Sequence, residues 1–113
     1  MEVLLEDKVA RIRELNDTLR CKLRGGKVVM TASVAELPDM VKAAALMHMS
    51  QFSEFTPDND PAGEHDFGGF EFCNRRFLWK IDYYDERMEY GSEDPADPKQ
   101  TTRVLTLMLA EDY

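Results

Sequence analysis

The stretch FGGFEFCNRRFLWKIDYYD, residues 67–85, decides the fold of this chain. Its second half alternates apolar and polar positions, a period of two that predicts a β-strand with one buried face. Four residues share the face expected to meet the core: Phe77, Trp79, Ile81 and Tyr83. We predict a β-hairpin with strands at 67–73 and 76–85 and a turn at Asn74-Arg75. Because Arg75 is a poor second turn residue, a bulged turn is the alternative.

Four further elements are predicted around this hairpin. Residues 3–23 repeat apolar side chains at 3.6-residue spacing, which favours an amphipathic helix. Residues 27–32 form a short segment rich in β-branched residues, so a strand is expected. A second helix is expected to begin within 34–39 and to end near residue 52, with its methionines filling gaps in the core. The apolar segment 101–110 is expected to be a central strand.

The beginning of the second helix carries two local signals. Ser33 and Glu36 have the spacing of a capping box, and Pro38 suits a first helical turn. Together the elements predict one α+β domain, residues 1–113, with an antiparallel sheet of about four strands and two helices packed on one face.

The totals limit the class of protein. A chain of 113 residues with 43% hydrophobic residues is enough for one core. It contains no apolar run near the ~20 residues that a membrane span needs, and its acidic N-terminus lacks the features of a signal peptide. We therefore expect a cytoplasmic protein that does not contact membranes. Cys21 and Cys73 are too few for a disulfide framework and are expected to be buried free thiols.

The charge is distributed unevenly. Residues 1–42 hold 8 Lys and Arg against 7 Asp and Glu, whereas residues 43–113 hold 6 against 15. A surface this acidic repels phosphates, which disfavours direct binding of nucleic acid. It suits a basic protein partner or a divalent cation, and it also serves solubility alone.

Most of these acids lie in two segments without periodicity. The first acidic loop (residues 53–66) contains no Lys or Arg, and the second acidic loop (residues 86–99) is rich in turn-forming residues. Unstructured loops of this length are uncommon in a small domain and are often functional.

The first acidic loop suggests a metal site. Its segment 58–63 resembles the opening of a calcium loop, but Ala62 stands where an oxygen ligand is needed, and Gly69 stands where the bidentate Glu is needed. An EF-hand is therefore excluded. A different divalent-cation site stays open, with these candidate ligands: Asp58, Asp60, Glu64 and His65, or Asp66 among the oxygen donors.

Catalysis is the second chemical possibility. A histidine beside carboxylates has a tunable proton affinity and can act as a base or a ligand. The catalytic candidates are His65, Asp66, Lys80 and Asp82, with Glu64 alongside. The structural alternative is that Asp66 accepts backbone hydrogen bonds in a turn and that His65 bridges the loop and the sheet. No hydrolase or nuclease motif is present.

Four blocks of sequence carry a resemblance to a known family. They are NDPxGEHDFG at residues 59–68, WKIDYYD at 79–85, GSxDPADP at 91–98 and RVLTxMLAExY at 103–113. On these blocks the chain resembles, over about residues 14–113, a family of small bacterial proteins catalogued as domain of unknown function 3768. The resemblance implies no established activity, ligand or catalytic residue. It implies an association with plasmids and integrated elements, among anti-restriction genes, and hence a role against host defence.

Three functional hypotheses follow. The first is an acidic, non-enzymatic interaction protein that inhibits a defence or DNA-processing enzyme, of the anti-restriction or anti-CRISPR type, by occupying its basic nucleic-acid-binding surface. Its partner-binding candidates are Glu64, Asp66, Asp85, Glu93, Asp94 and Asp97. The alternative is a small metal-dependent hydrolase that uses the Glu-His-Asp loop and a divalent cation; otherwise no cofactor is expected. The third is a homodimer formed through the methionine-rich helix.

Overall fold

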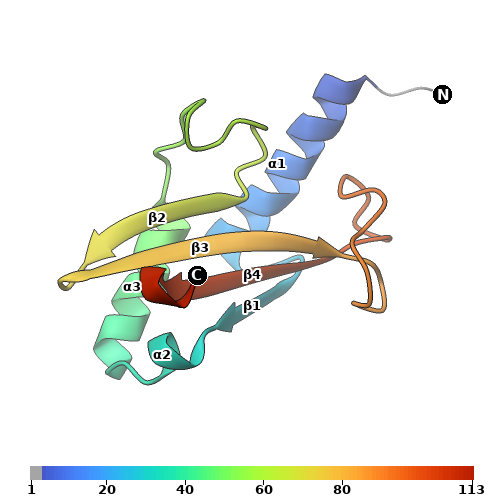
Figure 1. The fold of residues 1–113 in the computed structure, drawn as a ribbon. Helices are drawn as coiled ribbons and strands as arrows, with labels where there is room; N and C mark the ends of the chain where they lie inside the picture. The colour runs from blue at the N-terminus through green and yellow to red at the C-terminus, as the bar shows by residue number, and fades with distance from the viewer. Residues whose placement is uncertain (1–3) are drawn as a thin grey trace.

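The computed structural model describes residues 4–113, apart from the side chains of Leu5 and Glu6. Four strands and three α-helices form the fold, and a 3-10 helix follows the last strand (Figure 1). In chain order the elements are α1 (Leu5–Lys22), β1 (Lys27–Met30), α2 (Ala32–Ala35), α3 (Asp39–Gln51), β2 (Phe67–Phe72), β3 (Arg75–Tyr84), β4 (Thr102–Leu109) and η1 (Ala110–Asp112).

The strands form one sheet in the order β1-β4-β3-β2. The predicted α+β class is confirmed, and β4 lies in the interior of the sheet as expected. The prediction of a wholly antiparallel sheet is wrong at one pair, since β1 runs parallel to β4 while the two other pairs are antiparallel. Local periodicity identifies strands, but it carries no signal for the direction in which two distant strands meet.

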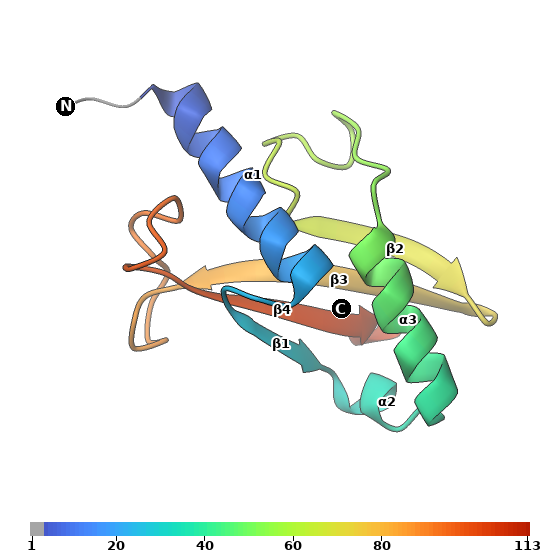
Figure 2. The ribbon, with the colours of Figure 1, turned by 180° about the vertical axis from the view of Figure 1, so that it is seen from behind.

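The long helices α1 and α3 cover the same face of the sheet (Figure 2). The core lies between these helices and the sheet. Its fully buried members include Leu19 from α1, Met49 from α3 and Trp79 from β3. Trp79 packs against the backbone of Gly68, where an added Cβ would lie 2.7 Å from the indole ring. The face of β3 that the sequence assigns to the core is therefore the face that the helices cover.

One predicted helix boundary differs from the structure, and one short helix was not predicted. The first helix ends one residue early, because Leu23 adopts the left-handed conformation and closes α1 before Gly25 and Gly26. Its predicted start at residue 3 lies outside the described residues. The second predicted helix is α3, and α2 is an additional short helix before it. Ser33 does not cap a helix, because its hydroxyl donates to Asp112, and Pro38 precedes the first turn of α3 as its N-cap.

The hairpin turn lies one residue earlier than predicted. Cys73 and Asn74 form a two-residue turn, with φ angles of 55° and 60°. Positive φ at both central positions identifies a type I′ turn, which matches the twist of the flanking strands. Both cysteines are exposed, so the prediction of buried thiols is wrong: Cys73 lies at the turn, and Cys21 lies on the outer side of α1.

The methionines of α3 divide between core and surface. Met49 is fully buried, but Met40 is 86% exposed and Met47 is 59% exposed, so only one of the three fills the core as expected. His48 is exposed on α3, and its ring packs against Phe70 and Phe72 with centroid distances of 5.5 and 4.7 Å. Within residues 4–113, no helix combines the length and apolar character needed to cross a membrane.

Candidate functional site

The first acidic loop is held by its own side chains. Asn59 accepts a hydrogen bond from the backbone N–H of Thr56 (2.8 Å) and donates to the carbonyl of Glu54 (2.8 Å). The buried carboxylate of Asp60 accepts from the backbone N–H of His65 (3.2 Å), which closes the loop. The loop is therefore compact although it has no helix or strand.

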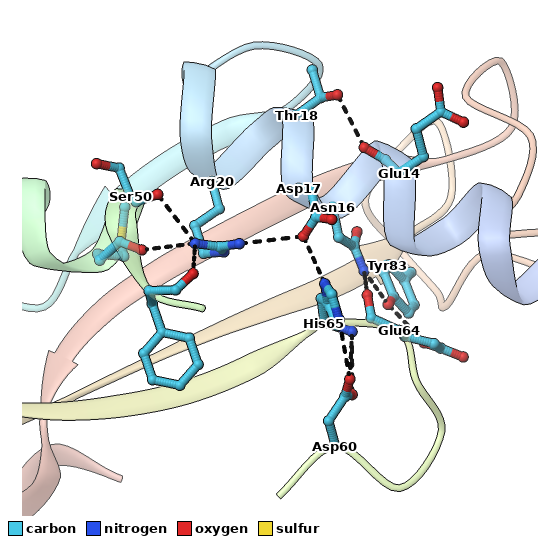
Figure 3. Close-up of polar contacts among 12 residues, drawn as sticks. Glu14, Asn16, Asp17, Thr18, Arg20, Ser50, Asp60, Glu64, His65 and Tyr83 are labelled. Atoms are coloured by element: carbon cyan, nitrogen blue, oxygen red, sulfur yellow. Dashed lines mark hydrogen bonds and ion pairs between the residues drawn. The ribbon is translucent and has the colours of Figure 1, made fainter. Parts of the chain in front are cut away.

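His65 joins this loop to α1. Its Nδ1 lies 2.9 Å from a carboxylate oxygen of Asp17, and its Nε2 lies 3.7 Å from Asp60 (Figure 3). Its ring stacks on Phe55 at a centroid distance of 3.7 Å and an angle of 5°. We expected His65 to bridge the loop and the sheet, but its partner is the helix. Both ring nitrogens therefore lie near carboxylates.

Arg20 continues this network to α3. Its guanidinium is 3% exposed and donates to Asp17 (3.2 Å) and to the carbonyls of Met49, Ser50 and Phe52 (3.1, 3.2 and 2.7 Å) (Figure 3). A helix end leaves its last carbonyls without partners inside the helix, and Arg20 supplies the donors. Asp17 thus accepts from both Arg20 and His65.

A second buried network connects the two acidic loops. The amide nitrogen of Asn16 donates to the carbonyl of Glu64 (3.0 Å) and to the hydroxyl of Tyr83 (2.7 Å), and Tyr83 donates to the carboxylate of Glu64 (2.7 Å). Arg103, 1% exposed, donates to the side-chain oxygen of Asn16 (2.8 Å) and to the carbonyl of Pro95 in the second acidic loop. One chain of hydrogen bonds therefore runs from the first loop through α1 and β4 to the second.

Burial changes the acidities within this network. Burial and the hydrogen bond to Glu64 raise the pKa of Tyr83 far above its usual value. Burial lowers the pKa of Arg103, although the nearby Tyr83 opposes that effect. Tyr83 therefore stays protonated at neutral pH and remains a donor to Glu64.

The second acidic loop uses some of its carboxylates to shape its own turns. Asp97 accepts from the backbone N–H of Lys99 (2.9 Å) and the side chain of Gln100 (2.8 Å), and these bonds lower its pKa. Asp94 accepts from the N–H of Ala96 (3.3 Å). Asp85 accepts from the N–H of Glu89 (3.0 Å) just before the loop.

Other carboxylates of this region accept no hydrogen bonds within the turns that the structure describes. Glu86 and Glu93 are exposed and line a surface hollow of about 440 Å³ with Asp85 and Tyr90. Their side chains make no hydrogen bond to another residue within 4–113. Their carboxylates are therefore exposed to solvent and hold no turn of this loop.

The six predicted partner-binding carboxylates form two groups at one end of the sheet. Glu64 and Asp66 precede β2, and Asp85 directly follows β3, with Glu93, Asp94 and Asp97 beyond it. Because β2 and β3 are antiparallel, the beginning of β2 and the end of β3 lie at the same end, and α1 passes between the two loops (Figures 1 and 2). In the described part of the chain, none of the six forms an ion pair.

The predicted catalytic residues do not share one site. Lys80 and Asp82 pair with each other at 3.0 Å, and this bond raises the pKa of Lys80. They lie on the face of β3 that points away from the helices, since Trp79 and Ile81 occupy the other face. His65 faces α1 instead. Asp66 is half-buried, and its burial together with the charge of Glu64 raises its pKa.

The candidate metal ligands also contact different groups and do not converge on one point. Asp60 binds the backbone of His65, Glu64 binds Tyr83, and Asp58 is exposed at the outer turn of the loop. Across residues 4–113, no group of three or more His, Cys, Asp or Glu side chains is arranged to hold a metal ion. The donor set therefore gives a divalent-cation site no support.

The sequence interpretation missed the residues that organise this site: Asn16, Asp17, Arg20 and Arg103. Helix periodicity placed the polar residues of α1 on a solvent-facing side. One signal was available, because Arg103 is a charged residue inside an apolar strand and such a residue needs a buried partner.

The comparisons with known proteins agree with the resemblance seen in the sequence. The family described as "Protein of unknown function (DUF3768)" matches residues 30–112, and the chain belongs to this family. The match covers β2, β3, β4, α3 and both acidic loops, while α1 and all of β1 except Met30 lie before it. No curated protein and no solved structure matches the chain.

Proposed function

We propose that this protein is an acidic, non-enzymatic interaction protein whose two acidic loops occupy a basic surface on a protein partner. One observation carries the proposal. The hydrogen-bond chain from Glu64 through Asn16 and Arg103 to Pro95 holds both loops at the same end of the sheet. The six candidate carboxylates are thereby presented at that end, and none of the six forms an ion pair inside the described chain.

The partner that fits this surface is a protein with a positively charged, nucleic-acid-binding groove. Carboxylates fixed on a compact scaffold place negative charge where the phosphates of a nucleic acid would lie, so the two compete for one groove. Complementary charge accelerates encounter and makes the complex sensitive to salt. The family resemblance adds the proposed setting, in which the partner is a defence or DNA-processing enzyme in the cytoplasm.

The alternative, a metal-dependent hydrolase, receives less support from the geometry. A general base must come within hydrogen-bond reach of its substrate, whereas Nε2 of His65 points toward the buried Asp60, 3.7 Å away, and Nδ1 lies 2.9 Å from Asp17. Lys80 and Asp82 lie on the other face of the sheet and cannot join His65 around one substrate.

A matched pair of charge variants tests the proposal. Glu86→Gln/Glu93→Gln removes two exposed charges from the second acidic loop. Asp94 and Asp97 are left intact, because their hydrogen bonds hold the turns of this loop. Glu36→Gln/Glu111→Gln removes two exposed charges elsewhere and is the control. Each tagged protein is incubated with a bacterial lysate, and captured proteins are measured with and without added duplex DNA.

We expect capture of a basic protein that is released by excess DNA and by salt above about 0.3 M, where charges are strongly screened. The Glu86→Gln/Glu93→Gln variant should capture about tenfold less, and the control should match the parent protein. Capture that DNA does not reduce, or equal losses in the two variants, would contradict the proposal.

A further inference from the structure

The edge of the sheet at β2 presents backbone groups that the fold does not use. Strand β2 is the last in the order β1-β4-β3-β2, so only one of its sides pairs with a neighbour. The N–H of Ile81 donates to the carbonyl of Asp66 at 2.8 Å, which identifies these two residues as a hydrogen-bonded pair. In an antiparallel pair, such residues recur at every second position.

The register then gives the direction of the backbone N–H and C=O groups in β2. These groups point toward β3 in Gly68, Phe70 and Phe72. They point to the free side in Phe67, Gly69 and Glu71. None of the residues 4–113 bonds to the outward groups of Gly69 or Glu71. Native proteins usually protect such an edge with proline, charge or a covering segment, but β2 contains one charged residue and no proline.

A groove runs beside this edge. It has a volume of about 440 Å³ and lies between the end of α3 and β2, which are neighbours in Figure 2. His48 and Phe52 line the side formed by α3, and Gly69 and Phe70 line the side formed by β2. The ring of His48 stacks on Phe70 with an interplanar angle of 24°, so the floor of the groove is aromatic.

The charges beside the groove select among occupants. Glu54 and Glu71 are exposed and line it, and neither carboxylate forms an ion pair in the part of the chain that the structure describes. Arg76 also lines the groove, so the two glutamates and this arginine give the groove a formal net charge of -1. A basic segment is therefore favoured over an acidic one.

We propose that the free edge of β2 binds an extended segment of a partner polypeptide as a fifth strand of the sheet. The outward N–H and C=O groups of Gly69 and Glu71, two residues apart, match the repeat of an extended backbone. Alternate side chains of the added strand point to opposite faces, so apolar residues enter the aromatic groove while basic residues lie near Glu71. This contact shares Glu54 with the first acidic loop, but it does not depend on the function proposed for the two loops.

Two synthetic peptides test this site. The probe is Lys-Val-Lys-Val-Lys-Val with blocked ends. Its control carries an N-methyl group on every backbone nitrogen, which removes the donors that face β2 in either strand direction but keeps the side-chain charge. Binding is followed through the backbone amide NMR signals of the full chain. Glu71→Pro removes one outward N–H at a position where an edge strand tolerates proline, and Glu71→Gln removes the charge alone. Gly69 is left unchanged, because a Cβ there would lie 2.9 Å from Leu78.

We expect the probe to shift the amide signals of Phe67, Gly69 and Glu71. N-methylation and Glu71→Pro should each weaken binding by about tenfold or more, and Glu71→Gln by less, since backbone bonds supply most of the affinity. The N-methyl control keeps the result decisive if Glu71→Pro does not fold.

Four results would overturn the inference: equal binding of both peptides, shifts confined to the two acidic loops, no binding at about 1 mM probe, or a homodimer through β2 that the probe cannot dissociate.

Discussion

At the scale of single residues, Asn16 shows how a polar side chain becomes part of a core. It is fully buried on α1, and its amide binds Glu64, Tyr83 and Arg103 at once. A buried amide without partners is costly, so each of these bonds is needed to keep Asn16 inside. Its partners come from the first acidic loop, β3 and β4, and helix periodicity alone cannot identify them.

Asp66 provides a pH-dependent prediction at the same scale. Its folded pKa is raised by burial and by Glu64, so the folded protein favours the neutral form and the ionised carboxylate lowers stability. Asp66→Asn is expected to stabilise the protein at neutral pH by less than about 1 kcal/mol, because solvent screens a half-exposed group. The gain should shrink as pH falls through the raised pKa and vanish below the unfolded value of 3.8.

Urea unfolding across pH measures this difference, and Asp97→Asn is the control with the opposite sign. The pKa of Asp97 is lowered by its hydrogen bonds, so its ionised form stabilises the fold. That variant should be less stable at neutral pH, and the difference should disappear as pH falls through the lowered pKa. If the stability difference between Asp66→Asn and the parent protein does not change with pH, the charge of Asp66 does not affect the free energy of unfolding.

At the scale of elements, the hairpin turn offers a stabilising substitution. Cys73 and Asn74 both have positive φ, which Asn and Gly adopt at lower cost than Cys. Cys73→Asn/Asn74→Gly is expected to raise the free energy of unfolding by about 1 kcal/mol, because Asn-Gly is the preferred type I′ pair. Chemical denaturation measures the change. Asn74→Val should lower stability, and a gain from that variant would show that the turn is not type I′.

The contact between α1 and α3 depends on Arg20. Arg20→Met removes the donor for the buried carbonyl of Met49 and for the half-buried carbonyls of Ser50 and Phe52 at the end of α3. We expect a loss of about 3 kcal/mol, with faster amide exchange in the last turn of α3. Arg24→Met, an exposed control near the end of α1, should change stability by less than about 0.5 kcal/mol. Equal losses in the two variants would mean that Arg20 contributes only its general charge.

At the scale of the whole molecule, a thermal scan separates the two functional hypotheses. A metal bound only by the folded state adds about 2.7 kcal/mol when its concentration is 100 times its Kd. We expect Mg²⁺, Ca²⁺, Mn²⁺ and Zn²⁺ to raise the melting temperature no more than NaCl of equal ionic strength, since no metal-binding group is arranged within residues 4–113. A specific increase that His65→Ala abolishes would instead support the hydrolase.

Much of the fold was predictable because its signals are local. Alternation along β3 identified the buried face, and 3.6-residue spacing identified α1 and α3. The turn at Cys73 was misplaced by one residue, since Cys has little preference for positive φ and Asn74 fits either turn position. The parallel pairing of β1 with β4 carried no local signal at all.

The candidate site divides in the same way. The two acidic loops and the position of His65 follow from residues close together in the chain. The partners of His65 do not, because Asp17 lies 48 positions away, and the bond between Asn16 and Arg103 spans 87 positions. Only the tertiary structure decided these contacts.

By itself, then, the amino-acid sequence determined which segments become the two long helices and the four strands, which face of β3 is apolar and where negative charge accumulates. Each of these depends on neighbouring residues. The tertiary structure decided that polar side chains of α1 enter the core, that Lys80 and His65 lie on opposite faces of the sheet, and that both acidic loops lie at one end of the sheet. Packing brings together residues far apart in the chain, and their proximity is not encoded in any local pattern.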